Sequence, residues 1–428
     1  MKNQTIAVIG IGYVGLPLAC LAADKGYQVL GVDINQKLID KVNKAQVPFK
    51  DDLVKKLLKK TVQSGNLKAS NDFKLLKKVE TIAVCVPTPV DENYQPDFKP
   101  LISAVQRIKE NLVKGQLVII ESTINPGVCE EIVLPILEQG GKKVGKDFYL
   151  AHAPERINPG DPKWNVSNLP RNVGALSKTG LKKAAQFYRD IIDAPINEMQ
   201  SIKEAEATKT IENAFRDINI AFINEIAKSF DQLGIDVVDV IKGASSKFSF
   251  MAHWPSCGVG GHCIPVDPYY LIRKAETVGF SHDFLKLARQ INNHMPKYTV
   301  ELYQDELNKV GLAVKGTKTA VLGIAYKADI DDTRESPAFE IIEELKKMGA
   351  DVLTYDPLVL EKSTEKSLKQ TLKKAQALLI VTDHSEFKEK LDGQTLKKNN
   401  IKVVLDGKNC LDKEDIVKAG VNYKGIGR

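Results

Sequence analysis

A cysteine stands in the glycine-rich stretch Gly258-Val-Gly-Gly-His-Cys263, and Asp267 follows it by four residues. Glycines permit tight backbone approach, so a loop of this composition can expose a thiol. A thiol reacts as its thiolate, and the aspartate is available for proton transfer or hydrogen bonding. The stretch therefore predicts a nucleophilic cysteine, with a buried structural cysteine in a turn as the alternative.

The same region allows a metal-binding interpretation. Four potential ligands lie within eleven residues: His253, Cys257, His262 and Cys263. Their spacings match no common zinc template, and adjacent residues make awkward joint ligands. We therefore predict no metal ion. A further hypothesis is a disulfide between Cys257 and Cys263 that switches the protein off under oxidation.

The N-terminal residues carry a dinucleotide-binding pattern. Gly10-Ile-Gly12-Tyr13-Val14-Gly15 follows the apolar stretch Thr5–Ile9, and Asp33 ends the next one, Gln28–Val32. In this pattern the glycines make the turn, admit the pyrophosphate and let the helix pack on the strand. The helix N-terminus adds amide donors and the positive end of a dipole. An aspartate at position 33 would hold the ribose hydroxyls and repel a 2′-phosphate, so the pattern predicts NAD rather than NADP.

Two further places have side chains suited to chemistry. Lys209, Asn213 and Arg216 stand at i, i+4 and i+7 of a predicted helix, where they could stabilise an oxyanion and bind a sugar. A solvated polar face is the alternative, although apolar neighbours disfavour it. Glu155 lies in the loop 153–160 after the predicted strand Phe148–Ala151, where doubly wound sheets place ligands. A general acid or base and a surface salt bridge are its two interpretations.

The elements that position these residues follow from hydrophobic patterning. Short apolar stretches alternate with helical segments in the first 151 residues, with strands expected at Thr81–Val86 and Leu117–Glu121 as well. Such runs predict a parallel sheet covered on both faces. The C-terminal part repeats the pattern, because residues 320–326 echo 7–13 and residues 348–356 echo 25–33. There Ala325 replaces the second glycine, and a charged insert at 327–335 precedes the helix.

A long helix is expected between the two repeats. The stretch Ser201–Glu204 forms a capping box, apolar residues then recur at helical spacing, and Gly234 ends the run. A helix of about thirty residues spans roughly 45 Å, which suits a connector and a dimer surface; an ordinary buried core helix is the alternative. We predict an α/β protein with two Rossmann-like doubly wound parallel-sheet domains joined by a long central helix. The expected domains are 1–198, which binds NAD, 199–300, which holds the cysteine loop, and 301–428.

Composition excludes several classes of protein. The 61 basic and 54 acidic residues give a net charge of +7, with no basic stretch interleaved with aromatics, so we expect no nucleic-acid partner. No apolar run approaches about 20 residues, so no membrane span is expected. The six cysteines are scattered, and Met1 leads directly into an apolar stretch. These features predict no signal peptide, no disulfide framework and a reducing cytoplasm.

Seven stretches resemble those of one enzyme family in the same order along the chain. They are Gly10–Gly15, Val86-Pro87-Thr88-Pro89, Glu121-Ser-Thr123, Pro154-Glu-Arg156, Ala205-Glu-Ala-Thr-Lys209 with Asn213, Gly258–Asp267 and Asp332-Thr-Arg-Glu-Ser336. The chain resembles the UDP-glucose/UDP-N-acetylhexosamine 6-dehydrogenase family over essentially its whole length. The resemblance implies NAD as cofactor, a UDP-sugar as substrate and a homodimer or larger homo-oligomer with central helices in the interface.

The resemblance also implies roles for individual residues. Cys263 would be the nucleophile, Lys209 would stabilise oxyanions, and Asn213 with Asp267 would order water and the thiol. Glu155 and Thr123 would serve acid–base work and thioester hydrolysis. Cofactor contacts beyond the glycine turn and Asp33 would come from Pro87, Thr88, Thr123 and Arg334. The implied substrate contacts are Glu155, Arg156, Lys209, Asn213, Arg216, Phe250, Gly260, Tyr326 and Lys327.

Chemistry and sequence detail bear on the substrate. A four-electron oxidation at C6 needs a trapped aldehyde, which a thiol provides as a thiohemiacetal and then a thioester. The stretch Gly260–Tyr270 resembles the N-acetylhexosamine branch, because the UDP-glucose branch usually has Ser before the cysteine and Lys before the aspartate. Residues Ser246–Phe250 resemble the UDP-N-acetylglucosamine enzymes; UDP-N-acetylmannosamine and UDP-glucose are the alternatives. The chain departs from the family at His253 and at Ser256-Cys257, where relatives usually show an aromatic residue and Gly-Pro.

Two other functions fit parts of the same pattern. A two-electron hydroxyacid dehydrogenase shares the N-terminal layout but does not need Cys263. A non-catalytic NAD-binding module would bind the cofactor without turnover. The combination of Lys209, Asn213, Cys263 and Asp267 disfavours both.

Overall fold

The computed structural model describes residues 4–49, 51–156 and 165–428. Contacts divide the chain into two compact units, one of residues 1–212 with 269–281 and one of residues 213–268 with 282–428. Each unit contains a parallel sheet, and a long helix contributes to both, which confirms the predicted fold class. The three-part division after residues 198 and 300 stays a prediction.

Among the described residues, eight strands form the sheet of the first unit, in the order β3-β2-β1-β4-β5-β6-β7-β8. They are β1 (Thr5–Ile9), β2 (Gln28–Val32), β3 (Leu67–Ser70), β4 (Thr81–Val84), β5 (Gln116–Ile120), β6 (Phe148–His152), β7 (Arg171–Ala175) and β8 (Ile196–Glu198). All neighbours are parallel except β6 and β7. The predicted bounds of β1 and β2 are confirmed to the residue.

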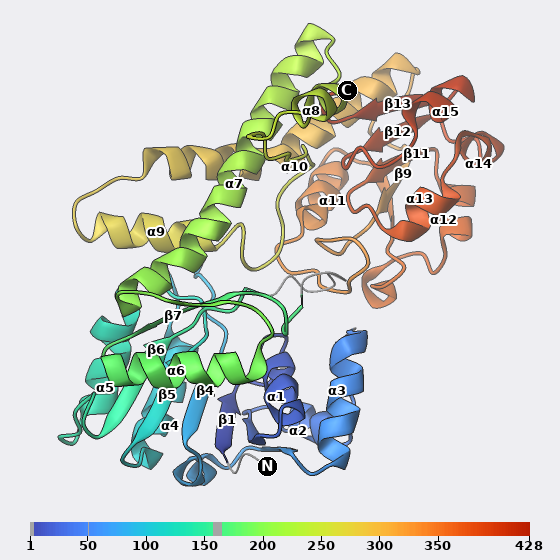
Figure 1. Ribbon diagram of the computed structural model, residues 1–428. Coiled ribbons are helices and arrows are strands. Elements are labelled where there is room, and N and C mark those ends of the chain that lie inside the picture. The colour runs from blue at the N-terminus through green and yellow to red at the C-terminus, as the bar shows by residue number, and fades with distance from the viewer. Residues whose placement is uncertain (1–3, 50, 157–164) are drawn as a thin grey trace. The chain divides into compact units, whose positions relative to one another are not determined.

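Helices cover both faces of this sheet because successive side chains of a strand point to opposite faces. Ile6 and Val8 of β1 belong to one apolar cluster with α1, α3 and α6, whereas Ala7 and Ile9 belong to another with α4 and α5. The helices are α1 (Gly15–Asp24), α2 (Gln36–Asn43), α3 (Asp52–Gln63), α4 (Lys99–Asn111), α5 (Leu134–Glu138) and α6 (Lys178–Ile191), with short turns η1 (Phe73–Lys78) and η2 (Cys129–Val133). Helix α9 (Asp267–Glu276) belongs to this unit from residue 269 onward. Figure 1 shows α6 lying in front of β4 and β5.

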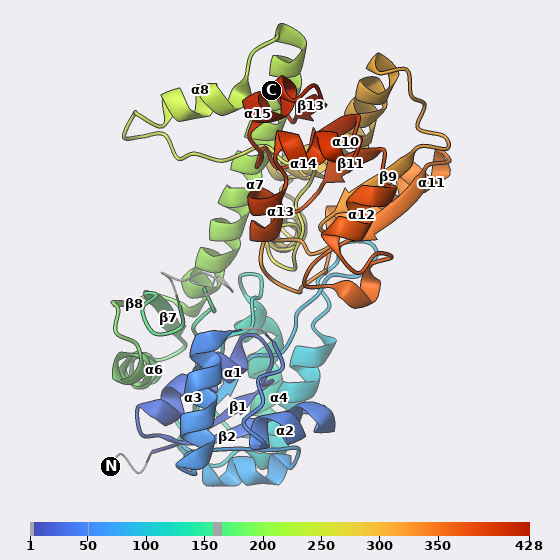
Figure 2. The same ribbon diagram turned by 90° about the vertical axis from the view of Figure 1, so that its right-hand side faces the viewer.

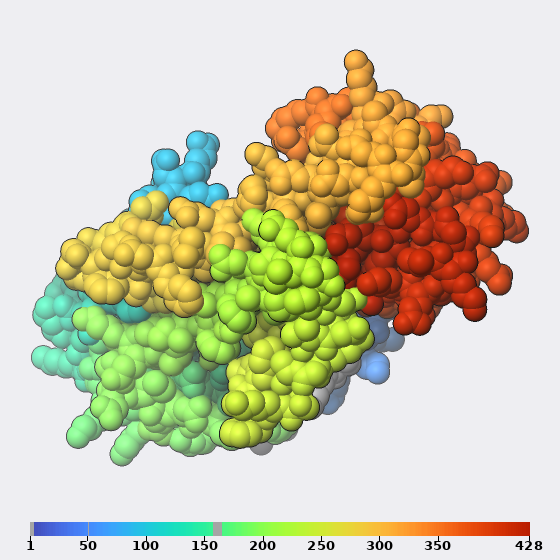
Figure 3. Space-filling view, turned by 90° about the horizontal axis from the view of Figure 1, so that it is seen from above, coloured from blue at the N-terminus to red at the C-terminus, as the bar shows by residue number. Residues whose placement is uncertain are grey.

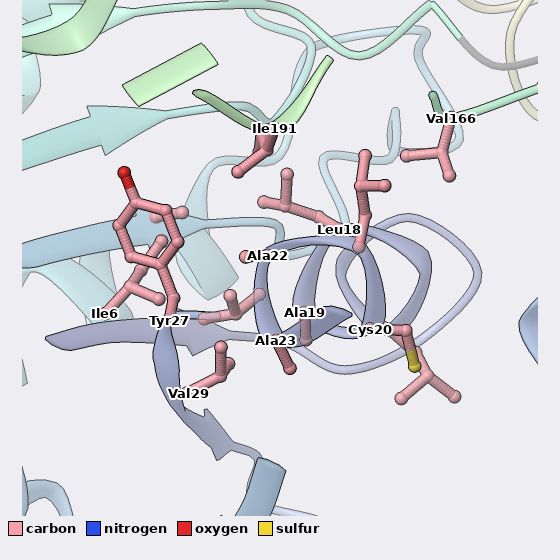
Figure 4. Packing of buried hydrophobic residues seen from close by; sticks show 14 of the residues in the cluster. Ile6, Leu18, Ala19, Cys20, Ala22, Ala23, Tyr27, Val29, Val166 and Ile191 are labelled. Atoms are coloured by element: carbon pink, nitrogen blue, oxygen red, sulfur yellow. The ribbon is translucent and has the colours of Figure 1, made fainter. Parts of the chain in front are cut away.

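Helix α1 is buried from Gly15 to Ala23. Its small residues Ala19, Ala22 and Ala23 lie among larger apolar side chains such as Ile6 and Val29 (Figure 4). Small side chains let a helix approach a sheet closely, and close packing strengthens dispersion contacts. The start of α1, and with it the glycine turn, is therefore held firmly against the strands.

The second unit repeats the architecture with five parallel strands in the order β10-β9-β11-β12-β13. They are β9 (Lys318–Leu322), β10 (Asp351–Tyr355), β11 (Ala377–Ile380), β12 (Val403–Asp406) and β13 (Asn422–Gly425). The helices are α8 (Val237–Ala244), α10 (Asp283–Lys309), α11 (Pro337–Lys347), α12 (Leu368–Lys374), α13 (Ser385–Lys390), α14 (Gly393–Lys398) and α15 (Lys413–Lys418), with the turn η3 (Leu360–Lys362). Helices α12 to α15 pack on one face and α10 and α11 on the other, so a second Rossmann-like sheet is confirmed (Figure 2).

Helix α7 (Ile202–Leu233) runs for 32 residues. The predicted capping box is present, since Ser201 N donates to Glu204 Oε2 at 3.0 Å and Glu204 N donates to Ser201 Oγ at 3.2 Å. Gly234 has a φ of +69° and stands directly after the helix, as glycine does at many helix ends. No helix within the described ranges combines the length and apolar character that a membrane crossing needs.

The buried side of α7 is unusually polar. Asp217 Oδ1 accepts hydrogen bonds from Arg289 Nη1 at 2.6 Å and from Asn292 Nδ2 at 2.8 Å, and all three residues are at least 95% buried. Asn224 Nδ2 donates to Asn292 Oδ1 at 2.9 Å, and Asn224 Oδ1 accepts from Ser256 N at 2.9 Å. These bonds join α7 to α10 and to the start of the cysteine loop.

Replacing Asp217 by alanine should destabilise the protein by about 3–5 kcal/mol, because the Arg289 guanidinium would remain buried without its carboxylate. The midpoint of urea unfolding measures the loss. Asp239→Ala is the matched control, since Asp239 pairs with Lys242 on the surface and should cost at most about 1 kcal/mol. Equal losses in the two variants would contradict this account of α7.

Candidate active site

The glycine turn of the first unit joins β1 to α1. Gly10 has a φ of +85°, and a Cβ there would come within 2.6 Å of the Cys85 carbonyl oxygen. A Cβ at Gly15 would overlap the Gly10 carbonyl oxygen, whereas a Cβ at Gly12 would meet no atom within 4 Å. The first and third glycines thus shape the turn, and the second leaves an open face, which fits the pyrophosphate of a dinucleotide.

Asp33, directly after β2, supports this turn. Its Oδ2 accepts a hydrogen bond from Ile11 N at 3.0 Å, and its Oδ1 accepts one from Asn35 N at 2.9 Å. Tyr13 is exposed and stacks on Phe49 with ring centroids 4.5 Å apart, while Val14 occupies the N-cap position of α1 without a side-chain hydrogen bond. The turn therefore presents a helix N-terminus and a half-buried carboxylate, which suit NAD.

Two of the predicted cofactor residues are brought together at the ends of β4 and β5. The Thr88 hydroxyl donates to the Thr123 carbonyl oxygen at 2.7 Å, and the Tyr270 hydroxyl donates to the Thr88 carbonyl oxygen. Pro87, beside them, is exposed. Both threonines are half-buried at the carboxyl edge of the sheet, where this class of fold binds ligands.

Glu155 is part of a buried ion pair rather than a surface salt bridge. Its Oε2 lies 2.5 Å from Arg171 Nη2, and its Oε1 accepts a hydrogen bond from Arg156 N at 2.5 Å. Arg156 itself pairs with Glu212 on α7, at 2.7 Å between Nη2 and Oε1. The guanidinium predicted to contact substrate is thus engaged with protein groups. Residues 157–160 of this predicted loop lie outside the described residues.

Arg171, the first residue of β7, was not found from the sequence as a candidate site residue. It is 1% exposed and lies between the carboxylates of Glu155 and Glu121, with Nη1 3.8 Å from Glu121 Oε2. Tyr188 of α6 donates its hydroxyl to Glu121 Oε1 at 2.5 Å. The sequence signals for this cluster were weak: a lone arginine at the start of a short strand, and an acid directly after the apolar residues 117–120.

The three polar residues of α7 have different surroundings. Lys209 is half-buried and belongs to the first unit, whereas Asn213 and Arg216 belong to the second. Asn213 is 5% exposed and donates from Nδ2 to Asp267 Oδ2 at 2.5 Å, but Arg216 is exposed. The structure therefore brings Asn213 to Asp267, and the roles of Lys209 and Arg216 stay predictions.

The cysteine loop is built by close backbone contacts within the second unit. A Cβ at Gly260 would come within 2.7 Å of Glu335 O and of Tyr326 Cβ, and one at Gly261 within 2.8 Å of the Tyr326 ring. Gly261 N donates to Arg334 O at 3.0 Å. Gly260 and Gly261 thus let the loop 258–263 pack directly on Tyr326 and on the charged insert 327–335, which together are called the 326–335 insert below.

Cys263 is half-buried and stands just before α9. Its carbonyl oxygen accepts hydrogen bonds from Val266 N at 3.0 Å and Asp267 N at 2.8 Å, which form a turn into the helix. Asp267 is 2% exposed because Asn213 and this turn enclose it. The thiol and the Asn213–Asp267 pair are therefore held by the same short segment.

The insert at 326–335 has its own supports. Tyr326 N donates to Asp332 O at 3.0 Å, and Arg334 pairs with the Asp332 carboxylate through Nη2 at 2.5 Å. Burial raises the pKa of Asp332, but the Arg334 hydrogen bonds outweigh it and hold that pKa below its ordinary value. Lys327 is half-buried in the same insert. It stays a prediction that Arg334 contacts the cofactor and that Lys327 contacts the substrate.

In the second sheet, the turn that corresponds to the glycine turn of the first unit is bound by Asp356, and His384 contacts the same carboxylate. Asp356 is fully buried and its Oδ2 accepts from Ile324 N at 2.7 Å and Ala325 N at 2.8 Å, as Asp33 does from Ile11. His384 Nε2 lies 3.0 Å from the same oxygen, and its Nδ1 accepts from Asp329 N at 3.0 Å. The carboxylate is therefore saturated by protein groups.

Phe250 and Cys257 lie in different surroundings from Cys263. Phe250 lines a surface hollow of about 240 Å³ with Phe215 and Phe222 of α7, and its substrate role stays a prediction.

Cys257 is fully buried, with Sγ 3.6 Å from Val381 O, and burial raises the pKa of its thiol. Such a thiol is a poor partner for Cys263 in a disulfide. Within the described residues, no group of three His, Cys, Asp or Glu side chains is placed to hold a metal.

Sequence comparison assigns each part of the chain to one family. Models of the UDP-glucose/GDP-mannose dehydrogenase family match as its NAD binding domain at residues 4–192, its central domain at 203–294 and its UDP binding domain at 320–413. The chain therefore belongs to the UDP-glucose/GDP-mannose dehydrogenase family. It is an NAD-dependent UDP-sugar dehydrogenase, within the part of the family that includes UDP-N-acetylhexosamine dehydrogenases.

Individual relatives span nearly the whole chain. A UDP-N-acetyl-D-mannosamine dehydrogenase of Pyrococcus horikoshii is 36% identical and covers 99% of both chains, and its solved structure matches with a TM-score of 0.94. A UDP-N-acetyl-D-glucosamine 6-dehydrogenase of Pseudomonas aeruginosa is 38% identical over 84% of both chains. The structure of an NDP-N-acetyl-D-galactosaminuronic acid dehydrogenase from Methanosarcina mazei matches with a TM-score of 0.86 and 33% identity, covering 100% of this chain and 95% of that chain.

The two glycines of the NAD turn should respond differently to alanine. Gly12→Ala should fold normally but raise the Kd for NAD at least about tenfold, because its Cβ would occupy the open face. Gly15→Ala should lower stability by about 1–3 kcal/mol through overlap with Gly10. Calorimetric NAD titration and thermal unfolding measure the two effects. Unchanged NAD affinity in Gly12→Ala would contradict the placement of the pyrophosphate.

Proposed function

We propose that this enzyme oxidises C6 of a UDP-N-acetylhexosamine from the alcohol to the carboxylate, through a thioester on Cys263. The observation that carries the proposal is the built loop around that thiol. Gly260 and Gly261 bring the loop against the 326–335 insert, and Cys263 lies half-buried beside the Asn213–Asp267 pair. A structural cysteine would not need this arrangement, as the fully buried Cys257 illustrates.

The reaction balances as two oxidations and one hydrolysis. Bound NAD supplies the hydride acceptor for each oxidation. The first oxidation converts the alcohol to an aldehyde, and the Cys263 thiol adds across its carbonyl to give a thiohemiacetal. The second oxidation gives the thioester; water then attacks the carbonyl carbon, the C–S bond breaks and Cys263 leaves as thiolate. Overall, one alcohol, two NAD⁺ and one water give one carboxylate, two NADH and three protons.

Residues of the chain take the remaining roles in this proposal. Lys209 stabilises the oxyanions that form at C6, since an ammonium favours developing negative charge. Asn213 and Asp267, joined at 2.5 Å, order the thiol and water. Glu155 accepts protons, with Thr123 positioning water beside it. The 326–335 insert, including Tyr326 and Lys327, contacts the UDP-sugar.

We propose UDP-N-acetylglucosamine as the sugar nucleotide. The stretch Ser246–Phe250 supports it, and so does the similarity to the Pseudomonas aeruginosa enzyme. UDP-N-acetylmannosamine is the second candidate, because the Pyrococcus horikoshii relative carries that name and matches over 99% of the chain. The two sugars differ in configuration at C2, which a pocket with a directed hydrogen bond can distinguish.

The outer face of α7 supports a homodimer or larger homo-oligomer. Ile211, Phe215 and Phe222 are each about half exposed there, and Phe248 and Met251 add apolar surface in the adjacent segment. Residues 235–255, drawn yellow-green, lie on the face shown in Figure 3. Several large apolar side chains exposed on one helix and its neighbouring segment are typical of an interaction surface. A cytoplasmic location completes the proposal, since a thiol nucleophile works in a reducing compartment.

The substrate assignment can be tested with a panel of UDP-glucose, UDP-GlcNAc, UDP-GalNAc and UDP-ManNAc. We expect UDP-GlcNAc to give the highest kcat/KM, with about two NADH formed per sugar consumed. Absorbance of NADH and chromatography of the sugar product measure both quantities. One NADH per substrate would instead support a two-electron dehydrogenase, and turnover of UDP-ManNAc alone would favour the second candidate.

Replacing Cys263 by alanine should leave the Kd for NAD within about twofold, because the glycine turn lies in the other unit. Formation of the uronic acid should fall by at least about 10³-fold, since no thioester can form. Cys257→Ala is the matched control and should retain acid formation. Acid production by Cys263→Ala at the parental rate would refute the covalent mechanism.

A further inference from the structure

Four buried groups meet where β5 and β6 end and β7 begins. Arg171 is 1% exposed, and the side chains of Glu121 and Tyr188 are completely buried. Glu155 is 7% exposed, so it retains solvent access that Glu121 lacks. Because β7 runs antiparallel to β6, its first residue stands at the edge where β5 and β6 finish.

One guanidinium is shared unequally by two carboxylates. Arg171 Nη2 lies 2.5 Å from Glu155 Oε2, whereas its Nη1 lies 3.8 Å from Glu121 Oε2 and donates to Pro154 O at 3.0 Å. Glu121 Oε1 accepts the Tyr188 hydroxyl at 2.5 Å, and the guanidinium carbon lies 5.6 Å from the Tyr188 ring centroid. With both carboxylates ionised, the cluster holds one positive and two negative charges.

This charge pattern makes the cluster able to hold one proton. A buried carboxylate paired alone with arginine binds a proton weakly, because protonation would leave a buried cation unpaired. A second carboxylate removes that penalty, since Arg171 stays paired with Glu121 when Glu155 is protonated. Burial holds the pKa of Glu121 above its ordinary value, Arg171 opposes this rise and the Glu155 carboxylate adds to it, so the two acids and the arginine interact electrostatically.

We propose that Glu121 is a positioning residue that tunes Glu155 as the proton acceptor for thioester hydrolysis, by sharing Arg171 with it. The inference rests on the proposed function of Glu155. In the step concerned, water oxygen bonds to the thioester carbon, one water proton passes to Glu155, and the C–S bond breaks to release the Cys263 thiolate. Tyr188 donates a hydrogen bond to the Glu121 carboxylate and so fixes its position beside Arg171.

Within the part of the chain that the structure describes, Cys85 and Arg156 are further charged or titratable groups beside the cluster. Cys85, after β4, interacts electrostatically with both carboxylates, and burial raises its pKa, so it stays a neutral thiol. Arg156 contributes its backbone amide to Glu155 while its guanidinium pairs with Glu212. Neither group supplies a second buried cation to the pair of carboxylates.

The test follows hydrolysis of the Cys263 thioester as a function of pH. The enzyme is mixed with NAD and the UDP-sugar that the panel identifies, then quenched at intervals, and the Cys263 adduct is followed by mass spectrometry. In Glu121→Gln the pH midpoint of the acid limb should fall by about one unit, because removal of a neighbouring negative charge makes Glu155 a weaker base. The rate on the plateau should fall about tenfold, with accumulation of the adduct.

Three further variants separate the outcomes. Glu121→Asp should restore the acid limb toward that of the parent, and Tyr188→Phe should shift it in the same direction as Glu121→Gln but by less. Ser122→Ala alters the same strand end without changing charge and should not move the limb. If Glu121→Gln does not fold, the shift of the acid limb can still be measured in Tyr188→Phe.

The inference and the proposed role of Glu155 can fail separately. Glu155→Gln should slow hydrolysis by about 10²-fold or more. If it hydrolyses the adduct at the parental rate, the role of Glu155 is wrong. If it blocks hydrolysis but Glu121→Gln keeps the parental acid limb, or loses rate equally at every pH, the tuning role of Glu121 is overturned while that of Glu155 stands.

Discussion

Every polar side chain on the buried face of α7 needs a hydrogen-bond partner, because an unpaired polar group in an apolar interior costs several kcal/mol. This requirement fixes the segments that carry the candidate site. Glu206 accepts the backbone amides of Gly127 and Cys129 in the first unit. Asn213 holds Asp267, and Asn224 holds the backbone of Ser256, at the two ends of the cysteine loop in the second unit.

The two sheets show how one architecture can be used for different tasks. Both place an aspartate after the second strand of the repeat, at Asp33 and at Asp356, and both aspartates accept a backbone amide of the preceding turn. In the first unit the turn is rich in glycine and Gly12 faces open space. In the second, Ala325 replaces that glycine and the following insert packs against the cysteine loop. Fold alone would not have separated these uses.

Local signals in the sequence were strong enough to predict much of this structure. Apolar runs bounded by glycine gave β1 and β2 to the residue, and the capping box at Ser201 gave the start of α7. The cysteine loop and the glycine turn were found because glycine is needed wherever backbone must approach closely.

Contacts between distant segments could not be predicted in the same way. Glu121 and Arg171 are fifty positions apart and meet only through the order β5-β6-β7 and the antiparallel direction of β7. The pairing of Arg156 with Glu212 likewise depends on where α7 passes. Burial of Cys257 depends on β12, since its amide donates to Gly407 O directly after that strand.

The saturated carboxylate of Asp356 has a consequence for stoichiometry. Its Oδ2 already accepts two amides and faces His384, so this carboxylate is not placed to bind the ribose of a dinucleotide in the way predicted for Asp33. Under the proposed function, both oxidations then use the NAD turn of the first unit. A four-electron oxidation at one such site requires the spent cofactor to be exchanged while the half-oxidised sugar waits. A covalent bond to the Cys263 sulfur would keep the half-oxidised sugar on the enzyme during this exchange, in addition to preparing its carbonyl carbon for the second oxidation.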